Sequence, residues 1–385
     1  MASQSLVLQT QNGLNNRSKT QTTDPTYVAQ AVNVDFADSG EIRKRNGTTK
    51  IYNGVRCHSF FKYNDSVAYF VENGDLKSLD LIAKTAATLK TGVGHNAMSY
   101  TVSAGKCYFS NGDMVGSIVN GVFRAWGVKR PDRNPDLSAV PLGGLFAGVY
   151  AVCLTYLSSG EESGAIAASF VNVAHGGGIA LSNFPLPPPE IDKIAVYVTS
   201  NNGKNLYLYG EFTASTQSLT IGYHISDIPL MTQFCFPPLS FSVVGSHFGR
   251  VFGAVGNVVY YSEPQRHGLF KANNYMVFTG NVKIIIAVKS ALFIVADKTY
   301  RIDNLNGDGY PVLTEIFPFG AVGAAVKDPV QESAVWMSDK GYVVATDENG
   351  VSLLNYDHIA VDKYTKGAVT VLEHDGIKQV IGSFR

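Results

Sequence analysis

The stretch Gly105–Phe123 reads GKCYFSNGDMVGSIVNGVF, and it contains the unit on which the predicted fold rests. Two short apolar runs lie on either side of Asn111-Gly112, and a second Asn-Gly pair follows at Asn120-Gly121. Such pairs accept the positive φ angles that both central residues of a type I′ hairpin turn require. Short apolar runs that end at these turns predict antiparallel strands joined by tight hairpins.

Similar units recur along most of the chain, and further Asn-Gly or Asp-Gly turns lie at Asn73-Gly74, Asn349-Gly350 and Asp375-Gly376. A degenerate strand repeat of about 40 residues predicts an all-β fold of the β-propeller type. Each blade is one small antiparallel sheet that buries its faces against its neighbours. The repeated units are Ser66–Leu81, Gly105–Phe123, Gly249–Ser262, Ser290–Ile302, Ser333–Leu354 and Gly367–Phe384.

The N-terminal segment Val32–Lys50 also has the pattern of a hairpin. We expect it to complete the blade that the C-terminal strands begin, because a ring closed in this way has no exposed sheet edge. Counting this shared blade once predicts about six blades, with five or seven also open. Residues 1–27 are polar, and they predict an extended arm that becomes ordered only against a neighbour.

Between residues 144 and 227 the strand spacing changes. The long alternating strand Val149–Tyr156 is followed by several short strands with frequent turns, and this pattern predicts an inserted β-sandwich. The piece Leu186-Pro187-Pro188-Pro189 cannot join a central strand. No cysteine pair brackets a tryptophan here, so the sandwich is expected to be fibronectin-III-like within the immunoglobulin-like class. The propeller is then discontinuous, over residues 28–143 and 228–385.

The charge of the chain is balanced, with 31 basic and 31 acidic residues. This balance gives no sign of a nucleic-acid-binding surface. Charged residues make up only 16% of the chain, against a usual value of about 25%. Either partners or neutral polar residues therefore cover much of the surface, and we favour partners.

The cysteines form no C-x-x-C pair and give no zinc or disulfide framework. We expect them to be buried thiols in a reducing compartment. The N-terminus lacks the apolar stretch of a signal peptide. Val282–Ala296 is too short and too charged to span a bilayer. We therefore expect synthesis in a cytoplasm and no membrane span. The four cysteines are Cys57, Cys107, Cys153 and Cys235.

Several short motifs follow one another along the chain. They are Gly13–Asn16 (GLNN), Ala31–Asp35 (AVNVD), Gly40–Gly47 (GEIRKRNG), Thr155–Gly164 (TYLSSGEESG), Val196–Ser200 (VYVTS), Tyr260–Pro264 (YYSEP) and Gly268–Phe270 (GLF). In this order they resemble the motifs of tail proteins of tailed bacteriophages. The first three resemble the opening of these proteins, the two stretches of the insert are similar to their sandwich module, and the last two are similar to their recurring Y-S-E-P and G-L-F pieces.

This resemblance implies the tail nozzle of a short-tailed phage. It implies a ring of copies, expected to be six, that continues the DNA channel below the portal and adaptor proteins. It also implies docking of tail fibres or a tip protein, and a location in the virion tail after synthesis in the host cytoplasm. Genome DNA would pass through the lumen without specific binding. A net charge of zero is compatible with that passage, because nonspecific DNA affinity comes from Lys and Arg neutralising phosphates.

Two groups of residues are interface candidates. The basic cluster Arg43, Lys44 and Arg45 is suited to contact either DNA or an acidic neighbour, or to form a solvated strand face, and we favour the last two. Glu263 and Arg266 lie beside the YSEP element, and their loss is expected to affect assembly rather than catalysis.

One loop has the spacing of a calcium site. Asn304, Asn306, Asp308 and Glu315 match ligand positions 1, 3, 5 and 12, and Gly309 matches position 6. Position 1 is Asn rather than Asp, and strands rather than helices are predicted on both sides. We therefore favour a Gly-rich loop between strands and expect no metal or cofactor.

No catalytic pattern is found in the sequence. It has no G-x-S-x-G, no H-E-x-x-H and no S-x-D-x-G-x-T-W box, so we expect no enzymatic activity and rank a glycan hydrolase last. The alternative function is a carbohydrate-binding propeller for host receptor recognition. Such a protein needs aromatic residues at equivalent blade positions, and Trp126 and Trp336 do not occupy equivalent positions.

Overall fold

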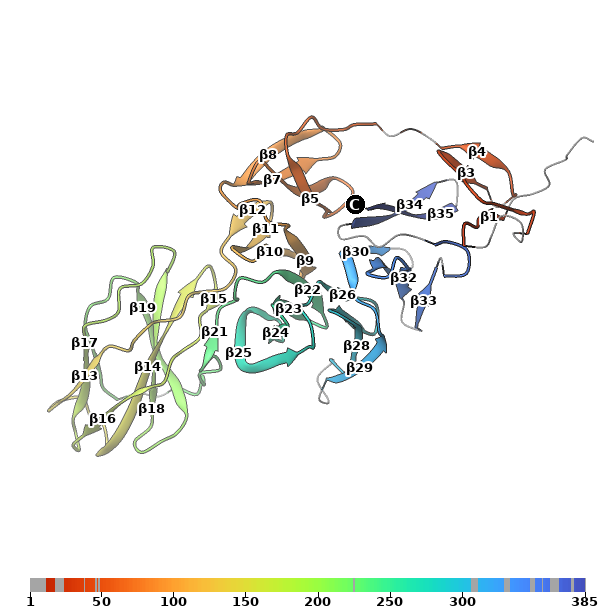
Figure 1. Ribbon diagram of the computed structural model, residues 1–385. Coiled ribbons are helices and arrows are strands. Elements are labelled where there is room, and N and C mark those ends of the chain that lie inside the picture. Colours follow the sequence, from red (N-terminus) through yellow and green to blue (C-terminus); the bar gives the residue numbers. More distant parts are fainter. Residues whose placement is uncertain are drawn as a thin grey trace, which may run out of the picture.

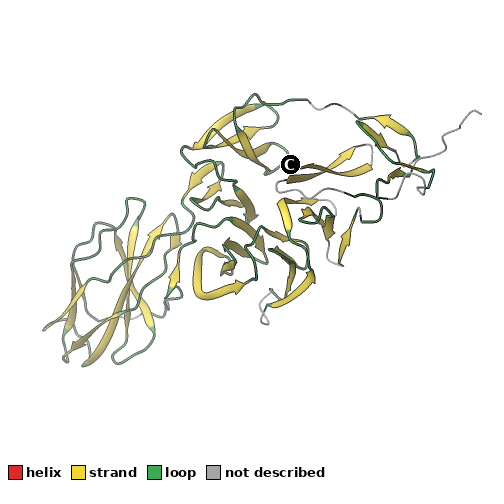
Figure 2. Ribbon diagram, in the orientation of Figure 1, coloured by secondary structure: helices red, strands yellow, loops and turns green. Residues whose placement is uncertain are grey.

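The computed structural model describes residues 12–17, 24–37, 39–45, 47, 49–223, 226–305, 311–328, 333–346, 350–354, 356–360, 367–374 and 377–384. Every regular element in this part of the chain is a β-strand (Figure 2). The described residues accordingly include no helix that is able to span a membrane. Of the arm expected at residues 1–27, only 12–17 and 24–27 are described.

Four-stranded antiparallel sheets follow one another along the chain and form the blades of a β-propeller (Figure 1). Blade 1 contains β5 (Cys57–Lys62), β6 (Val67–Glu72), β7 (Asp75–Asp80) and β8 (Thr85–Lys90). Blade 2 contains β9 (Ser99–Ser103), β10 (Lys106–Ser110), β11 (Val115–Val119) and β12 (Val122–Arg124). Blade 3 contains β22 (Val243–His247), β23 (Arg250–Val255), β24 (Val258–Glu263) and β25 (Arg266–Val277), with β21 (Cys235–Phe236) added outside β25.

Blade 4 contains β26 (Ile284–Ala287), β27 (Leu292–Val295), β28 (Thr299–Asp303) and β29 (Val312–Phe317). Blade 5 contains β30 (Ala321–Asp328), β31 (Ser333–Ser338), β32 (Val343–Thr346) and β33 (Val351–Leu353). Within each blade the strands pair in chain order, because each strand is joined to the next by a short turn.

Of the predicted hairpin turns, three lie within the described residues, and two of these follow the sequence signals while one departs from them. Asn349 and Asp375-Gly376 lie outside the described residues. Asn73-Gly74 and Asn120-Gly121 have positive φ at both residues, as a type I′ turn requires. At Asn111-Gly112 only the glycine has a positive φ. The Asn111 side chain instead accepts hydrogen bonds from the backbone N–H groups of Asp113 and Met114, at 3.1 and 2.9 Å. This turn is therefore built by a side-chain oxygen, as in an Asx turn.

The blades stack face to face, and in blades 2 to 5 the first strands lie against one another. The strands β9, β22, β26 and β30 contact one another in that order. The Thr101 hydroxyl donates to Ser246 Oγ over 2.8 Å, and Ser246 Oγ donates to the Val102 carbonyl over 2.8 Å. Apolar side chains fill the space between neighbouring blades. The largest fully buried ones in the blades include Phe109, Phe252, Phe293 and Trp336.

The two ends of the chain do not share a blade in the described residues. The N-terminal hairpin of β3 (Val34–Phe36) and β4 (Ile42–Lys44) pairs only with itself. The C-terminal hairpin of β34 (Gly367–His374) and β35 (Ile377–Phe384) joins blade 5 through a parallel bridge between β30 and β34. The C-terminal hairpin therefore pairs with β30 of blade 5 and not, as expected, with the N-terminal hairpin.

Side-chain contacts connect the N-terminal segment to residues 356–360 instead. This segment includes the short parallel pair β1 (Gly13–Leu14) and β2 (Tyr27–Val28). The Ala360 N–H donates to Asn16 Oδ1 over 2.7 Å, and the Tyr27 and His358 rings stack at 4.8 Å. The Arg17 guanidinium lies 4.4 Å from the Tyr356 ring centre. These contacts bring the two chain ends together without a shared sheet.

An inserted β-sandwich projects from the propeller (Figure 1). One sheet contains β13 (Asp136–Val140), β17 (Gly178–Ser182) and β20 (Leu219–Ile221). The other contains β15 (Glu161–Glu162), β14 (Gly148–Ser158), β18 (Lys193–Thr199) and β19 (Leu206–Thr213), with β16 (Ser169–Val173) paired to β14. Val152, Leu154, Ile179 and Ile194 are fully buried between the sheets. The sandwich begins at β13, before the boundary expected at residue 144.

Candidate functional site at the propeller–sandwich junction

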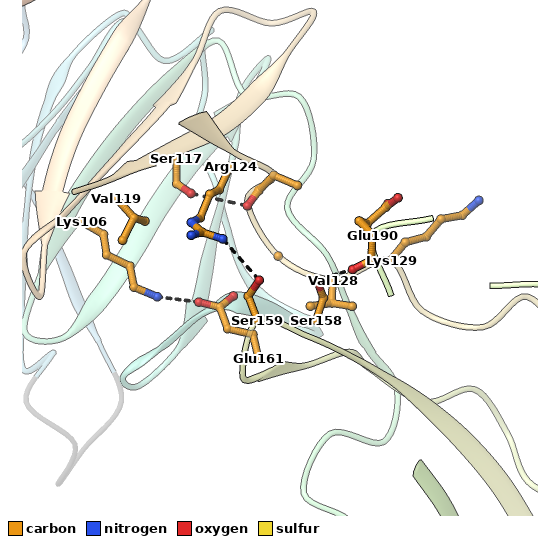
Figure 3. A pocket seen from close by; sticks show the side chains of 12 residues that line it. Lys106, Ser117, Val119, Arg124, Val128, Lys129, Ser158, Ser159, Glu161 and Glu190 are labelled. Atoms are coloured by element: carbon orange, nitrogen blue, oxygen red, sulfur yellow. Dashed lines mark hydrogen bonds and ion pairs between the residues drawn. The ribbon is translucent and has the colours of Figure 1, made fainter. Parts of the chain in front are cut away.

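A cleft of about 680 Å³ lies where the sandwich meets blade 2. Its walls come from β10 to β12, from the segment that leaves blade 2 at residues 125–129, and from the turn between β14 and β15 (Figure 3). These parts are distant in the sequence, and the propeller–sandwich contact brings them together. We call this cavity the junction cleft.

Two polar contacts cross the junction cleft (Figure 3). Lys106 Nζ on blade 2 pairs with Glu161 Oε1 of the sandwich at 2.6 Å, and Arg124 Nη1 donates to Ser159 Oγ over 3.3 Å. The Lys106 and Glu161 side chains remain 36% and 44% exposed. An exposed pair of this kind contributes only about 0–1 kcal/mol to stability. The two contacts therefore link the sandwich to blade 2 but contribute little to the stability of the fold.

The cleft also contains charged groups without a partner in the described chain. Lys129 and Glu190 line it, and neither side chain makes a hydrogen bond or ion pair with another described residue. Together with Lys106, Arg124 and Glu161, they give the cleft three cations and two carboxylates. The arrangement is suited to hold a polar group by charge-assisted hydrogen bonds.

Close backbone packing fixes the chain where it leaves blade 2. Gly127 has a φ of 78°, and a Cβ atom there would lie 2.8 Å from the Gly268 carbonyl oxygen. A Cβ atom on Gly268 would lie 2.7 Å from the Gly127 Cα atom. The Trp126 indole N–H donates to the His267 carbonyl over 2.8 Å. The exit segment is thereby held tightly against β25 of blade 3.

A buried histidine lies between blades 2 and 3 beside this exit. His267 Nε2 is 3.1 Å from the Gly249 carbonyl oxygen, which can only accept a hydrogen bond. Nε2 therefore bears the proton, and Nδ1 accepts from the Tyr108 hydroxyl over 2.9 Å. Burial lowers the pKa of His267, against the smaller opposite effect of the Gly249 hydrogen bond. Burial also raises the pKa of Tyr108, so both groups are neutral near pH 7.

The predicted basic cluster is largely neutralised within its own hairpin. Arg43 pairs with Glu41 and Arg45 pairs with Asp35, each at 2.8 Å. Lys44 lies between them on β4. These pairs reduce the positive charge that the cluster presents to a polyanion.

Glu263 and Arg266 face each other across the turn between β24 and β25. Glu263 accepts hydrogen bonds from Lys271 and Asn274, each at 2.7 Å. Burial by itself would raise the pKa of Glu263, but these two hydrogen bonds outweigh it and lower the pKa. Glu263 therefore has an internal role in blade 3, whereas the Arg266 side chain is exposed.

The predicted calcium loop is only partly described. Asn304 follows β28 with a φ of 59°, and Asn306 and Asp308 lie outside the described residues. Glu315 lies on β29 and accepts from Lys298 Nζ over 2.8 Å. Within the described part of the chain, no group of three or more His, Cys, Asp or Glu side chains is arranged to hold a metal.

The junction cleft was missed in the sequence analysis. Its charged residues are separated by long stretches, from Lys106 to Glu190, and no local pattern joins them. Glu161 lies in the stretch TYLSSGEESG, which was noted only for its resemblance. The polar turn in that stretch, which carries Glu161, was the one sequence feature that pointed to this cleft.

The fold and this junction define a β-propeller with an inserted β-sandwich. No protein-family model matches the chain, and no curated protein matches it. A crystal structure of BBS1N in complex with ARL6DN, soaked with lead, is 8% identical over 86% of this chain and 89% of that chain, with a TM-score of 0.33.

Two bacterial structures are similar to a comparable extent. Apo AztD from Citrobacter koseri is 12% identical over 76% of this chain and 69% of its own, with a TM-score of 0.27. Dipeptidyl peptidase 4 from Porphyromonas gingivalis is 9% identical over 80% of this chain and 39% of its own, with a TM-score of 0.28. Likenesses at this level carry no argument about function, and the propeller is assigned from the blades themselves.

Proposed function

We propose that this chain is a structural subunit of a bacteriophage tail, without enzymatic activity, that assembles side by side with copies of itself into a ring. The observation that carries the proposal is an apolar outer edge on two adjoining blades. In blade 3, Tyr275 and Val277 of β25 are 49% and 58% exposed. In blade 4, Val312 and Leu313 of β29 are 48% and 43% exposed.

These strands also have free backbone edges. Among the described strands, β29 has no outer neighbour, and β21 pairs only with Phe270 and Lys271 of β25. An exposed strand edge with apolar side chains promotes pairing with another chain. A second copy is the occupant that we propose, because the low charge content of 16% imposes little repulsion between identical faces.

Within a tail, the resemblance of the opening and YSEP motifs supports a place in the nozzle, in a ring that we expect to contain six copies. The channel would continue from the portal and adaptor proteins, and DNA would pass through without specific binding. The sandwich, oriented by the junction cleft, would be available to tail fibres or a tip protein. Zero net charge supports the passive role of the lumen.

The alternative of a carbohydrate-binding propeller receives less support. Trp126 and Trp336 are 4% and 0% exposed, and both pack between blades. Neither is available as a surface platform for a sugar ring. Neither tryptophan therefore supports the carbohydrate-binding alternative.

The test has two measurements on the same protein. Sedimentation velocity on the purified chain should show a discrete ring-sized species, and gold-tagged antibody against the chain should label intact particles only on the tail. A chain that stays monomeric at all concentrations and is absent from particles would overturn the proposal. If the antibody labels the tail but the purified chain is monomeric, the proposed location in the tail stands and the proposed self-assembly into a ring is overturned.

A further inference from the structure

A second cavity, of about 390 Å³, opens at the end of the sandwich away from the propeller. β14 runs from Gly148 beside this cavity to Ser158 at the junction cleft. An extended strand of this length spans about 33 Å between its end residues, at about 3.3 Å per residue. The cavity is therefore at the far tip of the projecting sandwich, and we call it the tip pocket.

The tip pocket has an apolar floor and aromatic walls. Leu145, Val198 and Ile221, at the end of the sandwich core, line its floor. At the rim, Phe146 is 61% exposed and Tyr223 is 68% exposed. Large aromatic groups gathered at a concave opening are typical of a binding surface, because leaving them in water is unfavourable.

Four polar side chains of the tip pocket make no hydrogen bond within the described chain. The Asn201 amide, the Ser200 hydroxyl and the Tyr207 and Tyr223 phenols line it, and none makes a side-chain hydrogen bond to another described residue. Among the described residues that line the pocket, none has a charged side chain. These residues therefore offer neutral donors and acceptors to a ligand, and none of them offers a counter-charge for an ion.

The loop that carries these groups is held in place. The Val149 N–H donates to Asn202 Oδ1 over 3.0 Å, and the Asn202 N–H donates to the Val149 carbonyl over 2.8 Å. The Tyr150 hydroxyl donates to the Phe146 carbonyl over 3.0 Å. These bonds fix the segments on both sides of the pocket, so a ligand would lose less free energy in ordering them.

We propose that the tip pocket is a binding site for a neutral saccharide. A pyranose ring has a face of C–H groups, which pack on the electron-rich face of an aromatic ring, and a rim of hydroxyl groups that both donate and accept. The tip pocket provides aromatic rings and neutral amide and hydroxyl groups in one concavity. A charged ligand would find no opposite charge there, and a purely apolar ligand would leave the amide and phenol groups without hydrogen bonds.

This inference does not rest on assembly into a ring. It places the saccharide on the inserted sandwich rather than on the propeller. The cavity volume lies in the lower part of the range of about 300–1,000 Å³ for small-molecule sites, so a mono- or disaccharide is the expected unit of recognition.

The test uses the purified full chain and saturation-transfer NMR with free glucose, galactose, mannose and N-acetylglucosamine, and with their common disaccharides. At least one sugar should bind saturably. Asn201→Ala and Tyr223→Ala should each weaken that binding about tenfold, the effect of losing one good polar contact or one aromatic face. Phe170→Ala is the matched control, because Phe170 is 73% exposed on the same sandwich and does not line the pocket.

Three results would overturn the proposal. They are no saturable binding of any neutral sugar by the wild-type chain, binding that both pocket variants retain, or equal weakening in Phe170→Ala. Wild-type binding is measured first, so a variant that fails to fold does not decide the result. The NMR signal also separates this test from that of the ring, because it is read on protein of any oligomeric state.

Discussion

The Tyr108 hydroxyl donates a hydrogen bond to Nδ1 of His267 over 2.9 Å, and this bond joins blade 2 to blade 3 beside the junction cleft. Both residues are buried, with exposed fractions of 3% and 6%. Since the Gly249 carbonyl requires the proton on Nε2, Nδ1 is left as the acceptor. The pair is therefore satisfied only when the imidazole is neutral.

Removal of the donor should be costly at this position. We expect Tyr108→Phe to reduce the free energy of unfolding by about 1–3 kcal/mol, because it leaves Nδ1 of His267 buried without a partner. Urea denaturation followed by tryptophan fluorescence measures the change. Tyr275→Phe is the matched control, since the Tyr275 ring is 49% exposed, and it should change stability little. Equal effects of the two variants would contradict the role given to the buried bond.

Acidification should weaken the propeller. Burial lowers the pKa of His267, and it lowers that of His247 to about 4. Below an unfolded pKa of about 6.5 the unfolded chain therefore binds protons that the folded chain does not. Stability should be complete above pH 6.5 and should fall towards pH 4, as thermal unfolding at stepped pH would show. His267→Gln and His247→Gln should each reduce the dependence of the melting temperature on pH. If neither variant reduces it, these two histidines are not its source.

The close approach at Gly127 should tolerate no side chain. Gly127→Ala places a Cβ atom 2.8 Å from the Gly268 carbonyl oxygen, in addition to a φ of 78°. Gly121→Ala is the matched control, because its φ is 75° and nothing lies within 4 Å of an added Cβ. Gly121→Ala should cost about 1–2 kcal/mol from backbone strain alone. Gly127→Ala should lower the free energy of unfolding clearly more in the same denaturation experiment. Equal losses in the two variants would show that the structure around Gly127 moves to make room for the added methyl group.

The outer edge of blade 3 should control assembly. Val277→Lys puts a charge on an exposed strand edge and should convert the ring to monomers without lowering the melting temperature. Ile82→Lys is the matched control, since Ile82 is 76% exposed in the turn between β7 and β8. Analytical ultracentrifugation of both variants gives the result. A Val277→Lys protein that still forms the ring would exclude this edge from the interface.

Glu263 and Arg266 should separate stability from assembly. Glu263→Ala removes the acceptor of two 2.7 Å hydrogen bonds and should destabilise blade 3 by about 1–2 kcal/mol. Arg266→Ala should leave the melting temperature unchanged and should weaken the proposed ring. Differential scanning calorimetry and sedimentation on both variants measure the two effects. A melting temperature lowered only by Arg266→Ala would reverse these roles.

Local signals in the sequence determined the all-β propeller class and the presence of an inserted sandwich. Asn73-Gly74 and Asn120-Gly121 specify tight turns because asparagine and glycine tolerate a positive φ, a property of the residues themselves. Alternation of apolar residues then identifies strands, and the prolines at 187–189 exclude a central strand there. These properties act over a few residues and can be read without knowledge of distant partners.

Tertiary structure alone decided which distant segments meet. β13 has few buried side chains and becomes a strand by pairing with β17, so its sequence gave little sign of where the sandwich begins. The N-terminal hairpin pairs only with itself, whereas β34 pairs with β30 of blade 5. The junction cleft and the tip pocket likewise join residues far apart in the chain. Local preferences act between near neighbours, whereas these two sites depend on long-range packing. The charged residues of the junction cleft and the aromatic residues of the tip pocket have no fixed spacing along the sequence.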